Sequence, residues 1–303
     1  MKKLKVLSLF DGMSCGQIAL NKSKIKYDSY LASEVKSVAI QVTQENYPNT
    51  IQLGDITKIN LDRLSPNIDL LIGGSPCQNF SLANRYTREG LKGEKSKLFF
   101  EFLKIKNHLN PRYFLLENVR MKKEDEEYIS KLLGVKPIYC DSFIFSGVYR
   151  KRLYWTNIPT HYLQEEIDKR TRNFDLIPNF QDIIEDGFVS RKYGTCLLES
   201  DGRPNVNLKK LARRFFKIGF GNVVFKDYET YKKLSIDYEL AQDGDIRVLN
   251  QRELETAKGV PLNYTKCLTR NESANIIGDA WQIDTIAKIF EGLKDQQEKI
   301  ILT

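Results

Sequence analysis

One cysteine of this sequence ends an apolar segment, where its side chain could be exposed and reactive. Cys77 lies in the stretch GGSPCQNFS, residues 73–81, directly after the apolar run 68–72. Cysteine is most often an inert core residue. The glycines and the proline before Cys77 predict an open turn instead, and a thiol in such a turn can act as a nucleophile when its thiolate form is favoured.

Two other sets of side chains suit acid–base or electrostatic chemistry. Glu117 follows the apolar run 113–116, where a partly buried carboxyl group could keep a proton or share one with a ring nitrogen. Arg150 and Arg152 stand two apart, so in an extended chain they would share a face and suit carbonyl oxygens, phosphates or carboxylates. The alternatives are a loop or capping carboxylate and a solvated basic edge.

The segment FDGMSCG, residues 10–16, has the features of a cofactor-binding turn. Its two glycines would let the backbone approach a nucleotide-like ligand, although it is neither G-x-G-x-x-G nor a P-loop. Glu34 and Asp55 each follow a predicted strand, where Glu34 can accept hydrogen bonds from ribose hydroxyls and Asp55 from an adenine amino group. A plain strand-to-helix turn and helix capping are the alternatives.

These residues need a framework that brings them together. Strands are predicted at 5–10, 27–33, 50–53, 68–72 and 113–116, and helices around 17–20, 37–45, 98–109 and 283–293. The alternation indicates a parallel α/β sheet, whose ligands lie beyond the carboxyl ends of the strands. One edge of the sheet is therefore expected to collect Asp11, Glu34, Asp55, Cys77 and Glu117.

The composition narrows the class of protein. With 303 residues, 41% of them hydrophobic, the chain can bury a sizeable core and predicts two domains. The sequence contains no apolar run near the roughly 18 residues of a membrane helix, and its apolar opening is too short for a signal peptide, so a cytosolic protein is expected. Five scattered cysteines and two histidines disfavour a metal site or a disulfide framework. The net charge of +8 favours a polyanionic partner, although many ordinary proteins are as basic.

Together, these motifs resemble those of the C5-cytosine DNA methyltransferases. FDGMSCG, Glu34, GDI, GGSPCQNFS, ENV and R-x-R occur in the family's order, and the segments 247–261 and 275–281 resemble its ninth and tenth motifs. Details such as LSLFDG and YWTN resemble the Dnmt3-like branch most, in a compact bacterial or phage type. The resemblance implies a Rossmann-like S-adenosylmethionine-dependent methyltransferase sheet of the α/β class with a smaller target-recognition domain. It implies a catalytic domain at 1–170, the recognition domain at 171–269 and a returning segment at 270–303.

The resemblance also implies a role for individual residues. Cys77 would attack C6 of a cytosine flipped out of double-stranded DNA, and Glu117 would hold the N3 side of the ring. Arg152, together with Arg150, would contact the cytosine O2 or support the site, and no metal would be needed. S-adenosylmethionine would be bound by Phe10, Asp11, Gly12, Met13, Ser14, Cys15, Gly16, Glu34, Val35, Asp55, Ile56, Pro76, Asp279, Ala280 and Trp281.

Two basic segments are expected to contact DNA. Residues 82–97 carry five basic and two acidic side chains and are predicted to form a loop that closes over DNA. The basic run 203–217 lies where the family has its recognition domain. A solvated loop or helix face is the alternative. The predicted DNA-contacting residues are Gln78, Ser81, Arg85, Arg88, Lys92, Arg203, Lys209, Arg213 and Arg214.

The sequence departs from the family pattern at two positions and leaves other classes to weigh. Val148 stands where glutamine is usual, and Asp279 replaces the usual asparagine. A tRNA methyltransferase of the Dnmt2 type would carry a Cys-Phe-Thr signature, a silent Dnmt3-like scaffold would lack the nucleophile or cofactor motif, and an adenine or N4-cytosine methyltransferase would carry an Asn/Asp-Pro-Pro-Tyr-like motif. We expect a monomer or weak oligomer in a bacterial or phage-infected cell, with the target sequence and the biological role open.

Overall fold

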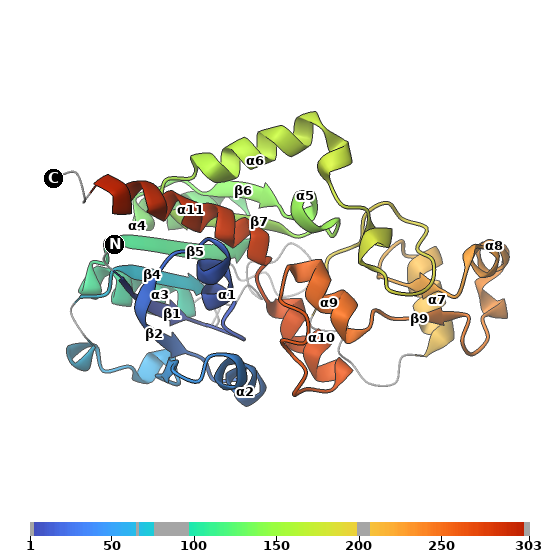
Figure 1. Ribbon diagram of the computed structural model, residues 1–303, viewed down its shortest axis with the longest axis horizontal. Helices are drawn as coiled ribbons and strands as arrows, with labels where there is room; N and C mark the ends of the chain where they lie inside the picture. Colours follow the sequence, from blue (N-terminus) through green and yellow to red (C-terminus); the bar gives the residue numbers. More distant parts are fainter. Residues whose placement is uncertain (1–2, 65–66, 76–96, 199–206, 300–303) are drawn as a thin grey trace. The chain divides into compact units, whose positions relative to one another are not determined.

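The computed structural model describes residues 3–64, 67–75, 97–198 and 207–299 (Figure 1). The chain divides into two compact units, of which the first comprises Met1–Cys140, Lys151–Glu165 and Thr285–Thr303. The second comprises Asp141–Arg150 and Glu166–Asp284. The sequence predicts boundaries at 170 and 270, whereas residues 141–150 group with the second unit and the chain re-enters the first unit at Thr285. The functional division into domains stays a prediction.

The first unit is built on a central sheet. In the described part of the chain this sheet has seven strands in the order β3-β2-β1-β4-β5-β7-β6. Strands β1 to β5 are parallel where they pair, and β7 is antiparallel to β5. The strands are β1 (Leu4–Leu9), β2 (Tyr27–Ser33), β3 (Ile51–Gln52), β4 (Leu70–Gly74), β5 (Tyr113–Val119), β6 (Ile138–Asp141) and β7 (Lys151–Thr156). The helices are α1 (Cys15–Lys22), α2 (Ser37–Asn46), α3 (Lys97–Leu109), α4 (Lys123–Leu133) and α11 (Ile283–Lys299).

Helices cover both faces of the sheet, as the nearly continuous burial of the side chains in β1, β4 and β5 requires. On one face, leucines of β1, β4 and β5 pack with Phe99 and Phe102 of α3 and with apolar residues of α4. On the other face, α1 approaches the sheet closely at Gly16. A Cβ atom added to Gly16 would lie about 2.5 Å from both Ile72 and Tyr30, so only glycine permits this packing. The predicted parallel α/β class is confirmed.

The two central strands differ from the prediction in their bounds. β4 begins two residues after the predicted start of the 68–72 run and includes Gly73, where an added Cβ would lie 3.0 Å from the carbonyl oxygen of Leu9. β5 continues to Val119 instead of ending at residue 116, because β7 pairs with it as far as the Val119 and Arg152 partners. Glu117 therefore lies inside a strand and not after it.

The second unit contains short helices and a two-stranded sheet. It contains α5 (Phe143–Ser146), α7 (Leu208–Phe216), α8 (Tyr228–Ile236), α9 (Gln251–Lys258), α10 (Arg270–Asp279), the 3-10 turn η8 (Tyr238–Leu240) and the paired strands β8 (Val224–Phe225) and β9 (Ile246–Arg247), while α6 (His161–Arg172) begins in the first unit and ends in the second. Leu211 and Phe215 of α7 pack with Phe225 and Ile246 in a separate core. Within the ranges that the structure describes, no helix is long and apolar enough to cross a membrane.

Candidate active site

The carboxyl ends of adjacent parallel strands meet at one edge of the first unit. Leu9 of β1 pairs with Ser33 of β2 on one side and with Gly73 of β4 on the other, and Gly74 pairs with Glu117 of β5. The turn after β1, Glu34 after β2 and Glu117 are thus brought to the same edge, as the sequence predicts. Strand order reverses between β1 and β4, and ligands of open α/β sheets bind at such a point.

The cofactor loop, residues 10–16, is a tight turn with alternating left-handed backbone. Phe10, Gly12 and Ser14 have φ values of 57°, 59° and 62°. The side chains of Asp11, Met13, Ser14 and Cys15 are buried under the loop, which leaves Phe10 and Gly12 as its partly exposed residues. The buried members of the predicted cofactor set therefore shape the loop, and a ligand above it would meet mainly backbone.

Glu34 is positioned by backbone hydrogen bonds around it. Its Oε2 accepts a bond of 2.8 Å from the Gly12 amide, and its Oε1 accepts from the amides of Val35 at 2.7 Å and Lys36 at 2.8 Å. The Val35 side chain beside it is 68% exposed. A carboxylate next to an exposed apolar side chain matches a ribose and an adenine ring in chemistry, so these two residues fit the predicted nucleoside.

Asp55 caps a short 3-10 turn. Capping is the alternative to cofactor binding that the sequence leaves open for this residue. Its Oδ1 accepts hydrogen bonds from the amide of Thr57 at 2.9 Å and from the hydroxyl of Thr57 at 2.8 Å. These two bonds lower the pKa of Asp55, so the group is an ionised acceptor. Ile56 is buried in the apolar core, and its contact with the cofactor stays a prediction.

The end of β4 is fixed by a side chain of β5. Asn118 donates from Nδ2 to the hydroxyl of Ser75 at 3.0 Å and to the carbonyl oxygen of Ser75 at 3.3 Å. Sequence reasoning missed this contact, although Asn118 stands in the ENV motif. The clamp holds Ser75, and the stretch 76–96 that follows lies outside the described residues. That stretch includes the predicted residues Pro76, Cys77, Gln78, Ser81, Arg85, Arg88 and Lys92.

Glu117 and Arg152 form an ion pair at the same edge. Arg152 Nε lies 2.7 Å from Glu117 Oε1, and the two side chains are only 14% and 10% exposed. The guanidinium also donates from Nη1 to the carbonyl oxygen of Lys151 at 2.8 Å. The antiparallel pairing of β5 with β7 brings these groups together, and it offers a carboxylate and a cation to one polar ring.

Arg150 does not join this pair, and the expectation that the two arginines present one shared face to the site is wrong. Its side chain is 4% exposed and donates to the carbonyl oxygens of Gly278 at 3.1 Å and Asp279 at 3.0 Å. Lys258, also buried, donates to the carbonyl oxygen of Ala280 at 2.9 Å. Two cations thus fix the carboxyl end of α10, because helix carbonyls there lack intrahelical donors. Arg150 supports the predicted cofactor segment Asp279–Trp281 within the second unit.

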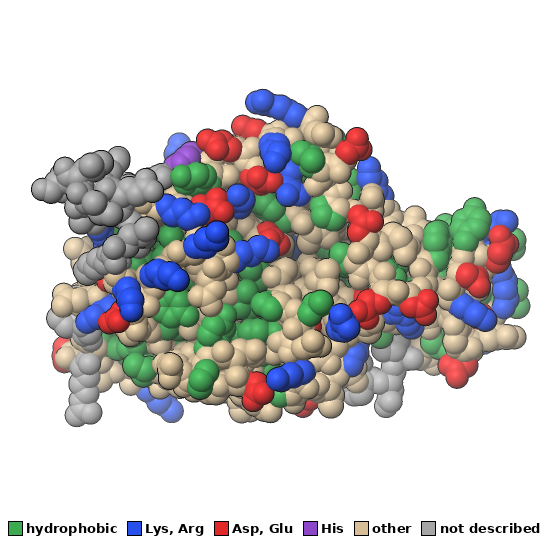
Figure 2. Space-filling view, viewed as in Figure 1, with side chains coloured by type: hydrophobic (Ala, Val, Ile, Leu, Met, Phe, Trp, Pro, Cys, Tyr) green, Lys and Arg blue, Asp and Glu red, His purple; other side chains and the backbone are tan. Residues whose placement is uncertain are grey.

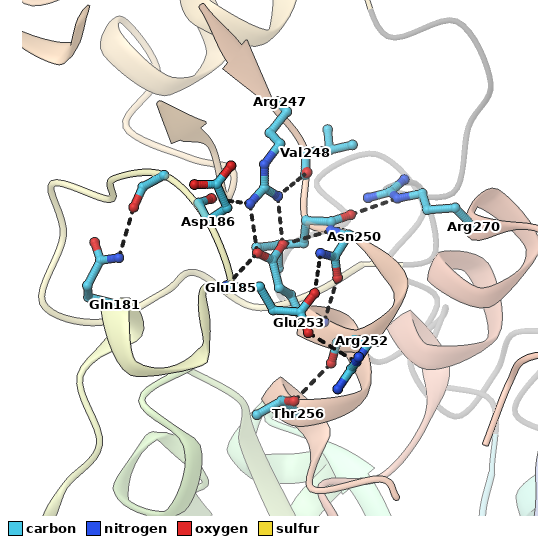
Figure 3. Close-up of polar contacts among 12 residues, drawn as sticks. Gln181, Glu185, Asp186, Arg247, Val248, Asn250, Arg252, Glu253, Thr256 and Arg270 are labelled. Atoms are coloured by element: carbon cyan, nitrogen blue, oxygen red, sulfur yellow. Dashed lines mark hydrogen bonds and ion pairs between the residues drawn. The ribbon is translucent and has the colours of Figure 1, made fainter. Parts of the chain in front are cut away.

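A second buried ion pair organises the predicted ninth motif (Figure 3). Glu253 is fully buried and faces Arg247, whose Nη1 and Nη2 lie 2.7 and 2.8 Å from its two oxygens. The amides of Asn250 and Glu185 also donate to Glu253, at 2.8 and 3.0 Å. Burial alone would raise the pKa of Glu253, but these hydrogen bonds outweigh it and lower the pKa. The sequence indicated the motif and gave no sign of its internal pairing.

Helix α7 carries the described part of the predicted DNA-contacting set. Lys209, Lys210 and Arg213 are exposed on the face opposite the buried Leu211 and Phe215. Lys209 lies 3.8 Å from a carboxylate oxygen of Glu239 in η8, and the guanidinium of Arg214 lies 4.9 Å from the ring centre of Phe220. Arg203 lies outside the described residues.

The described residues contain no group of three or more His, Cys, Asp or Glu side chains that could hold a metal ion. The chemistry of the described edge is instead that of carboxylates, a guanidinium and backbone amides. Such groups suit hydrogen bonding to a nucleoside and to a heterocyclic base.

Comparisons with known proteins show which families and relatives the sequence resembles. A family model described as C-5 cytosine-specific DNA methylase matches residues 4–135. The orphan methyltransferase M.Rho11sI of Bacillus phage rho11s is 38% identical over 122 residues, which is 40% of this chain. The type II methyltransferase M1.ScrFI of Lactococcus lactis subsp. cremoris is 25% identical over 328 aligned residues, which cover 98% of this chain and 79% of that protein.

The fold is shared with solved structures over almost the whole chain. The crystal structure of S. pombe Dnmt2 methyltransferase superposes with a TM-score of 0.70 at 16% identity, covering 97% of this chain and 99% of that one. This likeness confirms the predicted methyltransferase fold. The match to the phage relative spans about a quarter of that protein, 24%. The expected kinship with the Dnmt3-like branch stays a prediction.

Proposed function

We propose that the chain is a DNA (cytosine-5)-methyltransferase, because a family model described as C-5 cytosine-specific DNA methylase matches residues 4–135 and methyltransferases are among its relatives. Its substrate is a cytosine flipped out of double-stranded DNA, and its methyl donor is S-adenosylmethionine. The family description supports DNA as the substrate. The type II and orphan methyltransferases among its relatives support a place in bacterial or phage restriction–modification, in the cytoplasm.

One observation carries the proposal. The cofactor loop after β1, the clamped end of β4 and the Glu117–Arg152 pair on β5 and β7 lie on neighbouring strands of one sheet edge. A methyl donor at the loop and a base at Glu117 would therefore be neighbours. This adjacency is what transfer between two bound molecules requires.

The chain's own residues perform the proposed reaction as follows. The sulfur of Cys77 adds to C6 of cytosine, and C5 thereby becomes nucleophilic. Glu117 binds the N3 side of the ring and Arg152 supports its O2 side. When bound, S-adenosylmethionine supplies an electrophilic methyl group. After C5 has accepted the methyl group, loss of the C5 proton reforms the double bond and expels Cys77.

The residues proposed to hold the cofactor fall into two groups. Phe10, Gly12 and Glu34 offer backbone and carboxylate acceptors at the switch point, and Val35 offers an exposed apolar surface. Asp55 is an ionised acceptor at the end of β3. The segment Asp279–Trp281 of the second unit stays a separate prediction, and Arg150 and Lys258 hold the backbone of its first two residues.

The test is methyl transfer by the wild-type protein and by Cys77→Ser. The wild type should transfer labelled methyl groups from S-adenosylmethionine to duplex DNA. Cys77→Ser should lose turnover and keep its affinity for the cofactor, because serine is a far weaker nucleophile at C6. The matched control is Cys267→Ser, which alters a partly buried thiol of the second unit and should remain active.

Three outcomes would contradict the proposal. Methylation of tRNA but not of duplex DNA would assign the chain to the Dnmt2-type alternative. Cofactor binding without methylation of any DNA by the wild type would support the silent scaffold. Full activity of Cys77→Ser would refute the covalent mechanism.

A further inference from the structure

A chain of buried hydrogen bonds lies beneath the cofactor loop. Asp11 is 7% exposed, and its Oδ1 accepts a bond of 2.7 Å from the hydroxyl of Tyr30 on β2. Its Oδ2 accepts from the hydroxyl of Ser14, which in turn accepts from Gln17 Nε2 at 3.0 Å. Gln17 also donates to the hydroxyl of Thr50 at 2.8 Å. The network joins β2, the loop, α1 and the residue before β3.

The loop needs such support because its backbone conformation is unfavourable. Phe10 and Ser14 are left-handed although both carry a Cβ atom, a conformation that surrounding contacts must impose. Ser14 occupies the N-cap position of α1, yet its side chain makes no capping bond there. The hydroxyl is directed to Asp11 instead, so the carboxylate holds the residue that ends the loop.

Tyr30 has little freedom to move away from Asp11. It is 2% exposed, and its hydroxyl lies where α1 packs most closely on the sheet, about 2.5 Å from the position of a Cβ at Gly16. Burial raises the pKa of Tyr30 well above its usual value, so the phenol stays a donor. Replacing Tyr30 with phenylalanine would remove only the hydroxyl group and, with it, the hydrogen bond to Asp11.

The carboxyl group of Asp11 titrates in the range where enzymes work. Burial raises its pKa to about 6, the charge of Glu34 adds to this rise, and the bonds from Ser14, Ser8 and Tyr30 oppose it. Tyr30 is itself influenced by Asp11, Ser8 and the thiol of Cys15. In its ionised form, Asp11 accepts hydrogen bonds from the hydroxyls of both Tyr30 and Ser14. In the protonated form, one carboxyl oxygen carries the proton and becomes a hydrogen-bond donor.

We propose that Tyr30 is a positioning residue that acts through the ionised carboxylate of Asp11 to hold the cofactor loop in its binding shape. The inference rests on the proposed function, and it gives Asp11 an internal role in place of direct contact with the cofactor. Affinity for the cofactor is then linked to a proton. It is full above the pKa of Asp11 and falls as pH decreases through that value.

The experiment measures binding of S-adenosylhomocysteine by calorimetry between pH 5 and 8, so that catalysis is not needed. In the wild type, affinity should fall by up to about tenfold per pH unit below the midpoint, the limit for one proton. In Tyr30→Phe, affinity at pH 7.5 should fall about tenfold, a typical cost of one lost bond to a buried charged group. Its midpoint should also move to higher pH, because the Tyr30 bond lowers the pKa of Asp11.

Two further variants make the result specific. Asp11→Asn keeps the shape of the side chain but removes the group that titrates. The affinity of this variant for S-adenosylhomocysteine should therefore not change with pH. Tyr113→Phe removes a tyrosine hydroxyl at the opposite end of the same sheet and should match the wild type at every pH. Thermal unfolding of each variant checks that the fold is retained.

The outcomes separate this inference from the proposed function. If the wild type binds S-adenosylhomocysteine but Asp11→Asn keeps the same pH dependence, the proton belongs to another group and the inference is wrong. Unchanged affinity and midpoint in Tyr30→Phe would also overturn it. If the wild type binds no S-adenosylhomocysteine at any pH, the proposed function fails first.

Discussion

At the scale of single residues, the candidate site depends on side chains that hold one another across strands. Arg152 on β7 pairs with Glu117 on β5, and Asn118 beside Glu117 clamps Ser75 at the end of β4. One strand therefore carries both the proposed base-binding carboxylate and the amide that holds Ser75, two residues before the proposed nucleophile Cys77 in sequence. Glu117 reaches β7 and Asn118 reaches the end of β4, the two strands that flank β5 in the sheet.

The role of Glu117 predicts a loss of turnover on replacement by glutamine. Glu117→Gln keeps the size of the side chain but removes the proton exchange and the charge that faces Arg152. We expect kcat to fall by roughly 10²–10⁴, the range for a general acid–base group. Steady-state methylation of duplex DNA measures this change.

A matched control is Glu124→Gln in the first turn of α4, whose side chain is exposed. It should leave kcat unchanged, and both variants should bind S-adenosylhomocysteine as the wild type does. Wild-type turnover in Glu117→Gln would remove this residue from the mechanism.

At the scale of elements, α9 is held in the second unit by charge and not by apolar packing alone. Glu253 lies in its first turn, completes a capping box with Asn250 and accepts hydrogen bonds from Nη1 and Nη2 of Arg247 (Figure 3). The exposed ion pair of Arg252 with Glu185, at 3.0 Å, lies beside it. Only the buried pair should matter for stability, because solvent weakens the exposed one.

The two partners of the buried pair should differ in their effect on unfolding. Arg247→Met leaves the fully buried carboxylate of Glu253 unpaired, and we expect a loss of about 3–5 kcal/mol in the free energy of unfolding. Glu253→Gln keeps the bonds from the Asn250 and Glu185 amides and leaves Arg247, which is 35% exposed, able to reach water. It should cost about 1–3 kcal/mol. Denaturant unfolding measures both.

The exposed pair provides the control for this prediction. Arg252→Met should change the free energy of unfolding by less than about 1 kcal/mol. Equal losses for Arg252→Met and Arg247→Met would show that burial does not govern the network.

At the scale of the whole molecule, the chain carries a net charge of +8. The distribution of its basic side chains differs from one part of the surface to another. On the face shown in Figure 2, Lys and Arg side chains alternate with Asp and Glu. Helix α7 is different, because its solvent face carries Lys209, Lys210 and Arg213, Lys217 follows as its C-cap, and the helix contains no acidic residue. It is the described element best suited to the phosphates of DNA.

Neutralising α7 should therefore change how DNA binding responds to salt. For Lys210→Gln with Arg213→Gln, the slope of log affinity against log salt concentration should decrease by about 2, since each phosphate contact contributes roughly 0.9. Fluorescence anisotropy with duplex DNA at several salt concentrations gives the slope. The control pair, Lys169→Gln with Arg172→Gln, removes two exposed cations of α6. Equal slopes for both pairs would make α7 an ordinary solvated helix.

Much of the first unit could be predicted because its signals are local. The bounds of β2 are those predicted for residues 27–33, and α2, α3 and α11 start within a residue of their predicted starts. The strand-end residues Glu34 and Glu117 reach one edge because parallel strands share their direction. By contrast, β5 is longer than its apolar run, since its last residues owe their strand conformation to β7, over 30 residues away in sequence.

The sequence by itself determined the α/β class, the order of the motifs and the residue types available for chemistry, because strand, helix and turn preferences act over a few neighbours. Only the tertiary structure decided which side chains meet. It separated Arg152, which pairs with Glu117, from Arg150, which supports α10. It also turned Asp11 inward to Tyr30. These contacts depend on burial and on partners that are distant in sequence. A buried charged group is destabilising unless a group of opposite charge or a hydrogen-bond partner lies beside it.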